Sequence, residues 1–156
     1  MSKVGRASRN SSLMRTESIT GTKTITAAES GEVYFINYNT GATIEILLPP
    51  VKAGAYCKFV WATVQAHNDA IIEFKPPDGA AAGVLKGVIQ CMETDGTGPS
   101  AEADSGSATK FSVDGNPNVS LGSYLEAICD GTSWFLSGII MTVEGGTAGN
   151  VIAWDA

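Results

Sequence analysis

The sequence predicts an all-β protein: a single β-sandwich domain, jelly-roll-like, with an extended N-terminal arm. Short segments rich in β-branched and aromatic residues recur along the chain, and Gly, Pro, Asn or Asp bound each of them. No segment of helical length shows the 3.6-residue apolar period of an amphipathic helix. A length of 156 residues fits one sandwich domain. A closed β-barrel is the second choice.

The first element is the arm, residues 1–17, which precedes a body at 18–156. The arm is rich in Ser, Arg and Lys, and its sizeable apolar side chains are Val4, Leu13 and Met14. Such a segment cannot pack a core by itself, so we expect it to be flexible or to order against a partner. Its basic residues are Lys3, Arg6, Arg9 and Arg15.

The net charge of −6 is divided unevenly between arm and body. Four of the 10 basic residues lie in the first fifteen positions, which leaves 6 basic against 16 acidic residues, a charge of −10. Nucleic-acid phosphates require clustered Lys and Arg side chains. We therefore predict that the body does not bind nucleic acid.

Alternating side-chain patterns predict the strands of the body. In the segment 43–48, Ile44, Ile46 and Leu48 share one face, and the segment 70–75 has the same alternation. A period of two residues is typical of a strand with one face on a core. The other strand candidates are 22–27, 32–38, 56–64, 84–92, 109–114, 123–129, 133–141 and 151–154.

Connections between the strands carry further signals. Residues 129–134, CDGTSW, place an Asp-Gly turn between two apolar runs, which predicts a hairpin. Residues 94–107 contain no large apolar side chain and are expected to form a long loop. A Gly-rich connection at 142–150 leads to the apolar tail 151–154, which either closes its own sheet or docks through Trp154 on a neighbouring subunit.

Catalytic and metal-binding motifs are scarce. The chain has one histidine, His67, in a polar connection between two strand candidates, and it has no nucleophile motif such as Gly-x-Ser-x-Gly. Cys57, Cys91 and Cys129 are far apart in apolar surroundings, which indicates buried free thiols. We predict that the protein is not an enzyme and has no cofactor and no metal site.

The apolar segments are too short for a membrane span of about 20 residues, and the first thirty residues lack the apolar region of a secretory signal. We therefore expect synthesis in the cytosol and no membrane partner.

The aromatic residues, which include Trp61, Trp134 and Trp154, have two interpretations. They line a carbohydrate-binding groove, or they belong to the core or to subunit contacts.

Several sequence strings resemble a pattern of tailed-bacteriophage virion proteins. Residues 31–37, 42–50 and 54–60 read GEVYFIN, ATIEILLPP and GAYCKFV, a strand, an edge ending in Leu-Pro and a second strand after a Gly turn. Residues 122–138, GSYLEAICDGTSWFLSG, resemble the closing hairpin of such proteins. The resemblance covers most of the body, about residues 30–140.

Among virion proteins, a short single domain behind a basic arm is most similar to a head decoration, or cement, protein. This resemblance implies a homotrimer that binds the major capsid protein on the outside of the capsid, stabilises the assembled head, and is made in the host cytoplasm. The alternative is a tail-associated module that binds the host surface or a glycan. The interface residues we expect are Lys3, Arg6, Arg9, Leu13, Met14 and Arg15 in the arm and Trp154 in the tail.

Overall fold

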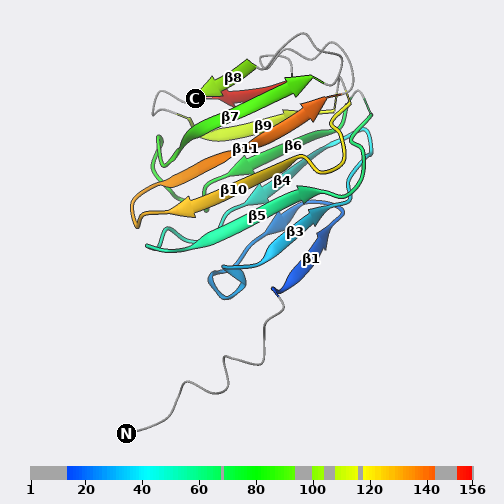
Figure 1. The fold of residues 1–156 in the computed structure, drawn as a ribbon. Helices are drawn as coiled ribbons and strands as arrows, with labels where there is room; N and C mark the ends of the chain where they lie inside the picture. Colours follow the sequence, from blue (N-terminus) through cyan, green and yellow to red (C-terminus); the bar gives the residue numbers. More distant parts are fainter. Residues whose placement is uncertain are drawn as a thin grey trace, which may run out of the picture.

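The computed structural model is a β-sandwich of two packed sheets (Figure 1). It describes residues 14–67, 69–93, 100–103, 108–115, 118–142 and 151–155. Apart from the strands, these residues include a short 3-10 helix, η2 (Ala27–Glu29). The predicted all-β sandwich is therefore confirmed.

The larger sheet has seven strands and the smaller sheet has five. In spatial order, the larger sheet contains β1 (Thr16–Ile19), β3 (Val33–Ile36), β5 (Tyr56–Trp61), β10 (Tyr124–Cys129), β11 (Trp134–Thr142), β7 (Leu85–Glu93) and β8 (Ser100–Ala103). The smaller sheet contains β12 (Ile152–Asp155), β9 (Lys110–Asp114), β6 (Ile71–Lys75), β4 (Thr43–Leu47) and β2 (Lys23–Thr24).

The first six strands alternate between the two sheets, so the chain crosses from one sheet to the other after each strand. Strands β1, β3 and β5 pair in parallel in the larger sheet, and β2, β4 and β6 pair in parallel in the smaller one. The β10–β11 hairpin then lies between β5 and β7, and β9 pairs antiparallel with β6 and β12. A jelly roll is built from antiparallel Greek keys, so these connections differ from it although both are sandwiches.

Two strands lie where the sequence analysis expected none. Strand β1 begins at Thr16, inside the predicted arm, and its one buried side chain is Ile19. Strand β8 lies at 100–103, inside the predicted loop 94–107. Both are short strands at an edge of the larger sheet, and a strand that buries little apolar surface leaves a weak sequence signal.

Aromatic rings from both sheets meet in the core. Tyr34 stacks on Phe59 with ring centroids 5.4 Å apart, and Phe59 meets the edge of Phe74 at 4.9 Å. At the other end of the core, Phe111 lies 4.8 Å from Trp154. Each such pair contributes about 0.5–1.5 kcal/mol beyond the apolar area that it buries.

The C-terminal tail closes its own sheet. Strand β12 pairs antiparallel with β9 and places Ile152 beside Val113 and Trp154 beside Phe111. Of the two alternatives for this tail, the sheet-closing one is therefore present in the single chain. A subunit contact through Trp154 stays a prediction.

The predicted hairpin at 129–134 is confirmed. Strands β10 and β11 are antiparallel with Cys129 opposite Trp134. The Asp130 Oδ1 atom accepts hydrogen bonds from the backbone N–H groups of Thr132 at 2.7 Å and Ser133 at 2.8 Å. These two bonds close the turn, as Asp side chains do in Asx turns.

Candidate interaction surface

The outer face of the smaller sheet is covered by an ion-pair row. Lys75 Nζ lies 2.6 Å from Glu45 and 2.9 Å from Glu73. Lys110 Nζ lies 2.6 Å from Glu73 and 3.4 Å from Asp155. Charged pairs of this kind between neighbouring strands are typical of a sheet face in contact with water.

The pKa of Glu73 in this row is lowered from its ordinary value. Burial alone would raise it, but hydrogen bonds from Lys110 and Lys75 outweigh that effect. The hydrogen bonds to Glu45 and then Glu73 raise the pKa of Lys75, and the hydrogen bond to Glu73 raises that of Lys110. All three groups therefore stay charged near neutral pH, and this face stays ionic.

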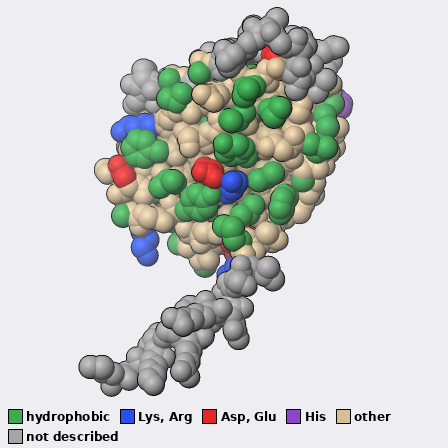
Figure 2. Space-filling model, viewed as in Figure 1, with side chains coloured by type: hydrophobic (Ala, Val, Ile, Leu, Met, Phe, Trp, Pro, Cys, Tyr) green, Lys and Arg blue, Asp and Glu red, His purple; other side chains and the backbone are tan. Residues whose placement is uncertain are grey.

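The outer face of the larger sheet is mostly apolar (Figure 2). Val88 is 53% exposed and Ile128 is 49% exposed, although both lie within strands of the sheet. We call this surface the apolar face. Its outward-facing apolar and aromatic side chains are Phe35, Tyr56, Val60, Val88, Met92, Tyr124, Ile128, Phe135, Ile139 and Met141.

One ion pair lies within the apolar face. Lys58 on β5 and Glu126 on β10 are direct cross-strand neighbours, and Lys58 Nζ lies 2.9 Å from Glu126 Oε1. The Tyr56 hydroxyl donates to the same oxygen at 3.3 Å, and Lys58 Nζ lies 5.0 Å from the ring centre of Tyr124. The hydrogen bond from Lys58 to Glu126 also raises the pKa of the lysine. Two tyrosine side chains, Tyr56 and Tyr124, thus lie beside the pair.

A second lysine on this face also lies over a ring. Lys86 Nζ is 6.0 Å from the ring centre of Phe135, its direct neighbour in the register of β7 and β11. A cation over an aromatic ring adds about 0.5–1 kcal/mol at an exposed site. Among the described outward-facing residues of β3, β5, β10, β11 and β7, the charged ones are Lys58, Lys86 and Glu126.

The apolar face has a shallow hollow between its described residues. Its volume is about 280 Å³, and its lining includes Val88, Gln90, Tyr124, Glu126 and Ile139. This volume lies at the lower end of the range of small-molecule sites, which is about 300–1,000 Å³. A broad and nearly flat apolar surface is instead typical of a protein-protein contact.

The arm joins the body at an edge of the same sheet. The Arg15 guanidinium lies 3.6 Å from Glu32, and the Arg15 backbone oxygen accepts a hydrogen bond from the N–H of Val33 at 2.9 Å. The Arg15 side chain is still 78% exposed, and Met14 is 58% exposed. Both predicted interface residues are therefore accessible at the root of the arm. The other predicted arm residues, Lys3, Arg6, Arg9 and Leu13, lie outside the described residues.

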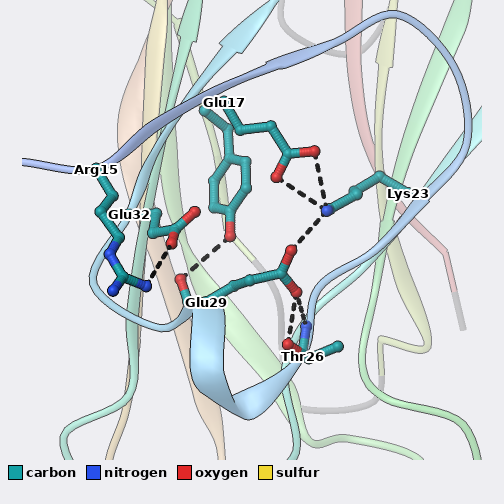
Figure 3. Close-up of polar contacts among 7 residues, drawn as sticks. Arg15, Glu17, Lys23, Thr26, Glu29 and Glu32 are labelled. Atoms are coloured by element: carbon teal, nitrogen blue, oxygen red, sulfur yellow. Dashed lines mark hydrogen bonds and ion pairs between the residues drawn. The ribbon is translucent and has the colours of Figure 1, made fainter.

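A polar cluster holds this end of the sandwich together (Figure 3). Lys23 Nζ lies 2.9 Å from Glu17 on β1 and 2.7 Å from Glu29 in η2, so it connects the edge strands of the two sheets. The second carboxylate oxygen of Glu29 accepts hydrogen bonds from the backbone N–H and the hydroxyl of Thr26, both at 2.6 Å. Hydrogen bonds from Lys23 and then Thr26 lower the pKa of Glu29 to about 2.

The residues considered for catalysis form no catalytic constellation in the described structure. His67 lies in a turn, where its backbone N–H donates to Asn39 Oδ1 at 2.9 Å and its Nδ1 accepts from the N–H of Asp69 at 3.3 Å. The described residues contain no cluster of three His, Cys, Asp or Glu side chains that could hold a metal ion. Within the same residues, no helix is long and apolar enough to cross a membrane.

The predicted buried thiols are confirmed. Cys57, Cys91 and Cys129 are buried, and none of the three forms a disulfide. Burial raises the pKa of Cys57 to about 12 and also raises that of Cys91. Neutral thiols of this kind are inert packing groups rather than nucleophiles.

Two of the three tryptophans are core residues. Trp61 and Trp134 are fully buried, and their indole N–H groups donate to Gln65 Oε1 at 2.9 Å and to the backbone oxygen of Pro49 at 3.2 Å. They therefore line no carbohydrate groove, which corrects that part of the aromatic hypothesis. The Trp154 indole packs on Phe111 and is partly buried.

The apolar face was not predicted from the sequence. A signal for it was present in the segments 84–92 and 133–141, which read VLKGVIQCM and SWFLSGIIM. Both segments have apolar residues at odd and at even positions, which point to opposite faces of a strand. A strand with only one face on a core alternates between apolar and polar residues, so this pattern indicates that both faces are covered.

Searches for matching protein families, curated proteins and solved structures return no match for this chain. The resemblance to virion proteins therefore depends on the sequence strings alone.

Proposed function

We propose that this chain is a structural protein of a phage virion, a head decoration or cement protein that binds the outside of the capsid. The sequence resemblance is the source of this proposal. The structural observation that supports it best is that the apolar face and the root of the basic arm belong to the same sheet. A protein that joins neighbours in a shell needs more than one contact surface.

The arm is the proposed contact with the major capsid protein. Its four basic side chains can pair with acidic groups on the capsid, and Leu13 and Met14 can anchor in apolar depressions. An arm that orders on binding covers a long path with few residues. The exposed Met14 and Arg15 lie where this path would begin.

Binding of this kind stabilises the head by mass action. A ligand that binds the assembled shell but not its separated subunits stabilises the shell by about 2.7 kcal/mol per site when its concentration is 100 times its dissociation constant. No chemical step is needed for this role. The proposed protein is accordingly a non-enzymatic homo-oligomer without a cofactor.

The proposal is tested by sedimentation of the protein with heads that lack it. The full chain should sediment with the heads and raise their melting temperature, and a chain without residues 1–13 should do neither. This deletion ends before β1, so the body keeps all its described strands. If the full chain does not bind heads, the proposal is wrong; if the truncated chain binds as well as the full chain, the role of the arm is wrong.

The alternative is a tail-associated module that binds the host surface or a glycan. Burial of Trp61 and Trp134 removes two of the aromatic groups that such a module would use to stack on sugar rings. Electron microscopy of virions labelled at this protein distinguishes the two locations. Label on the head supports the cement role, and label on the tail supports the alternative.

A further inference from the structure

The apolar face has the composition of a protein contact and a charge distribution that is complementary to itself. We propose that it packs against the same face of a second copy of this chain. In this arrangement a two-fold axis runs parallel to the strands and passes between β5 and β10. The pairing replaces the homotrimer that the sequence resemblance implies.

The ion pair of the apolar face indicates this axis. Lys58 and Glu126 are direct neighbours on adjacent strands, so a two-fold axis between them exchanges their positions. Lys58 then faces Glu126 of the partner subunit, and Glu126 faces the partner subunit's Lys58. Both charges gain an opposite charge across the contact, and neither faces a like charge.

The strand register extends the match to the apolar side chains. Phe35, Val60, Tyr124 and Ile139 lie side by side in one row across β3, β5, β10 and β11. The proposed axis exchanges β5 with β10 and β3 with β11. Val60 therefore faces the partner subunit's Tyr124, and Phe35 faces Ile139 of the partner subunit.

The size of the face is sufficient for such a contact. The axis also exchanges β1 with β7, so the contact spans the six strands from β1 to β7 in sheet order. Strands lie about 4.8 Å apart and rise about 3.3 Å per residue, so six strands of about six residues present a face of about 29 Å by 20 Å. Two such faces bury about 1,100 Å² even before the relief of the side chains is included, which exceeds the roughly 1,000 Å² expected of a specific interface. Two sheets can stack in this way at about 10 Å, as in a sandwich.

Charge also favours a second copy over other occupants. The body carries −10 outside the first fifteen residues, whereas the charged side chains of the apolar face are two lysines and one glutamate. Acidic bodies repel each other over most of their surface, and this face is where the repulsion is weakest. A strongly charged partner would find no matching charge cluster on it.

This inference goes beyond the proposed function because the contact forms without a capsid. Sedimentation equilibrium of the full chain measures it directly. Wild-type protein should reach twice the 16.2 kDa monomer mass. The single variants K58E and E126K should each dissociate at least tenfold more readily, because each places like charges opposite one another across the axis.

Mixing the two single variants is the decisive step. In a mixed pair the two acidic groups of K58E face the two basic groups of E126K, so heterodimers should form where neither variant pairs with itself. The matched control is the pair Lys75 and Glu45, which lies on the charged face of the smaller sheet at 2.6 Å. The variants K75E and E45K should behave as wild type, alone or mixed.

A substitution in the apolar surface completes the test. Ile139→Lys on the apolar face should give monomers, and Ile71→Lys on the smaller sheet should not. Protection of the buried thiols from alkylation shows that each variant is folded. Wild-type protein that is monomeric at high concentration, a dimer unaffected by Ile139→Lys, or a mixture that pairs no better than its components would overturn the inference. Loss of capsid binding by a chain that still dimerises would instead count against the proposed function alone.

Discussion

Trp61 and Gln65 connect the two sheets through one buried amide. The indole N–H of Trp61, at the end of β5, donates to Gln65 Oε1 at 2.9 Å. The amide nitrogen of Gln65 donates to the backbone oxygens of Ala70 at 2.6 Å and of Val113, on β9, at 3.2 Å. Gln65 is 0% exposed, so the indole N–H of Trp61 and the Gln65 amide depend on this arrangement for their partners, whereas the Ala70 oxygen also accepts from the N–H of Gly115 at 2.8 Å.

Replacement of Gln65 by Leu should therefore destabilise the fold. The change leaves the indole N–H of Trp61 buried without its hydrogen-bond partner, which should cost about 1–3 kcal/mol in the free energy of unfolding. Urea denaturation followed by tryptophan fluorescence measures the loss. Gln90→Leu, at an exposed position of β7, is the matched control and should change the stability by less than about 0.5 kcal/mol. Equal stability of the two variants would contradict the role of the amide.

Truncation should separate the arm from β1. Deletion of residues 1–13 should leave the unfolding free energy unchanged, because it removes no described strand. Deletion of residues 1–19 also removes β1 and the buried Ile19 side chain, whose burial alone is worth about 1.5–3 kcal/mol. Chemical denaturation of both proteins measures the difference. Two truncated proteins of equal stability would show that β1 adds nothing to the fold.

The acid stability of the protein should depend on Glu29. Its pKa falls from an ordinary value of 4.5 to about 2 through the hydrogen bonds from Lys23 and Thr26. Because the folded pKa lies below the unfolded one, this stabilisation is complete above about pH 4.5 and is lost as the pH falls toward 2. The pKa of Lys23 is raised, so its share of the stabilisation is complete below about pH 10.5 and is lost only as the pH rises above that value, outside the acid range.

Glu29→Gln tests this dependence. The variant should be less stable than wild type at pH 7 and should lose less stability between pH 5 and pH 2, so the two curves converge in acid. Thermal melts across this pH range measure both effects. Parallel curves for the two proteins would show that Glu29 does not carry the dependence.

The sequence predicted strands and turns better than it predicted their partners. Alternation at 43–48 and 70–75 shows which side chains enter the core, and the Asp130-Gly131 turn pairs two strands that are adjacent in sequence. In the first six strands, each parallel pair joins two strands that are separated in the sequence by a strand of the other sheet. The two-residue period of apolar side chains indicates which face of a strand is buried, but it does not indicate which other strand pairs with it.

The candidate site was predictable only in part. The basic arm is a local feature of composition, so the sequence was sufficient to identify it. The apolar face is assembled from β3, β5, β10, β11 and β7, which come together only after folding. Phe35 and Ile139 lie far apart in the sequence, yet they belong to one row of this face. A surface of this kind becomes visible when the strand order is known.

Gly138 allows β10 and β11 to approach closely. A Cβ atom at this position would overlap the backbone oxygen of Tyr124 and would lie 2.9 Å from the Cα of Leu125. Since both groups belong to the backbone of β10, they cannot move without a shift of the strand. Gly138→Ala should therefore cost about 1–3 kcal/mol, as overpacking does in cores.

Gly21→Ala is the matched control for Gly138→Ala. No heavy atom lies within 4 Å of a Cβ built at Gly21, so this change should leave the stability within about 0.5 kcal/mol of wild type. Urea denaturation of both variants gives the comparison. Hydrogen exchange adds a local readout, because strand separation at Gly138 should weaken the protection of the β10 and β11 amides while leaving β4 and β6 protected. Unchanged protection of β10 in a destabilised Gly138→Ala protein would place the cause elsewhere than in the close approach of these two strands.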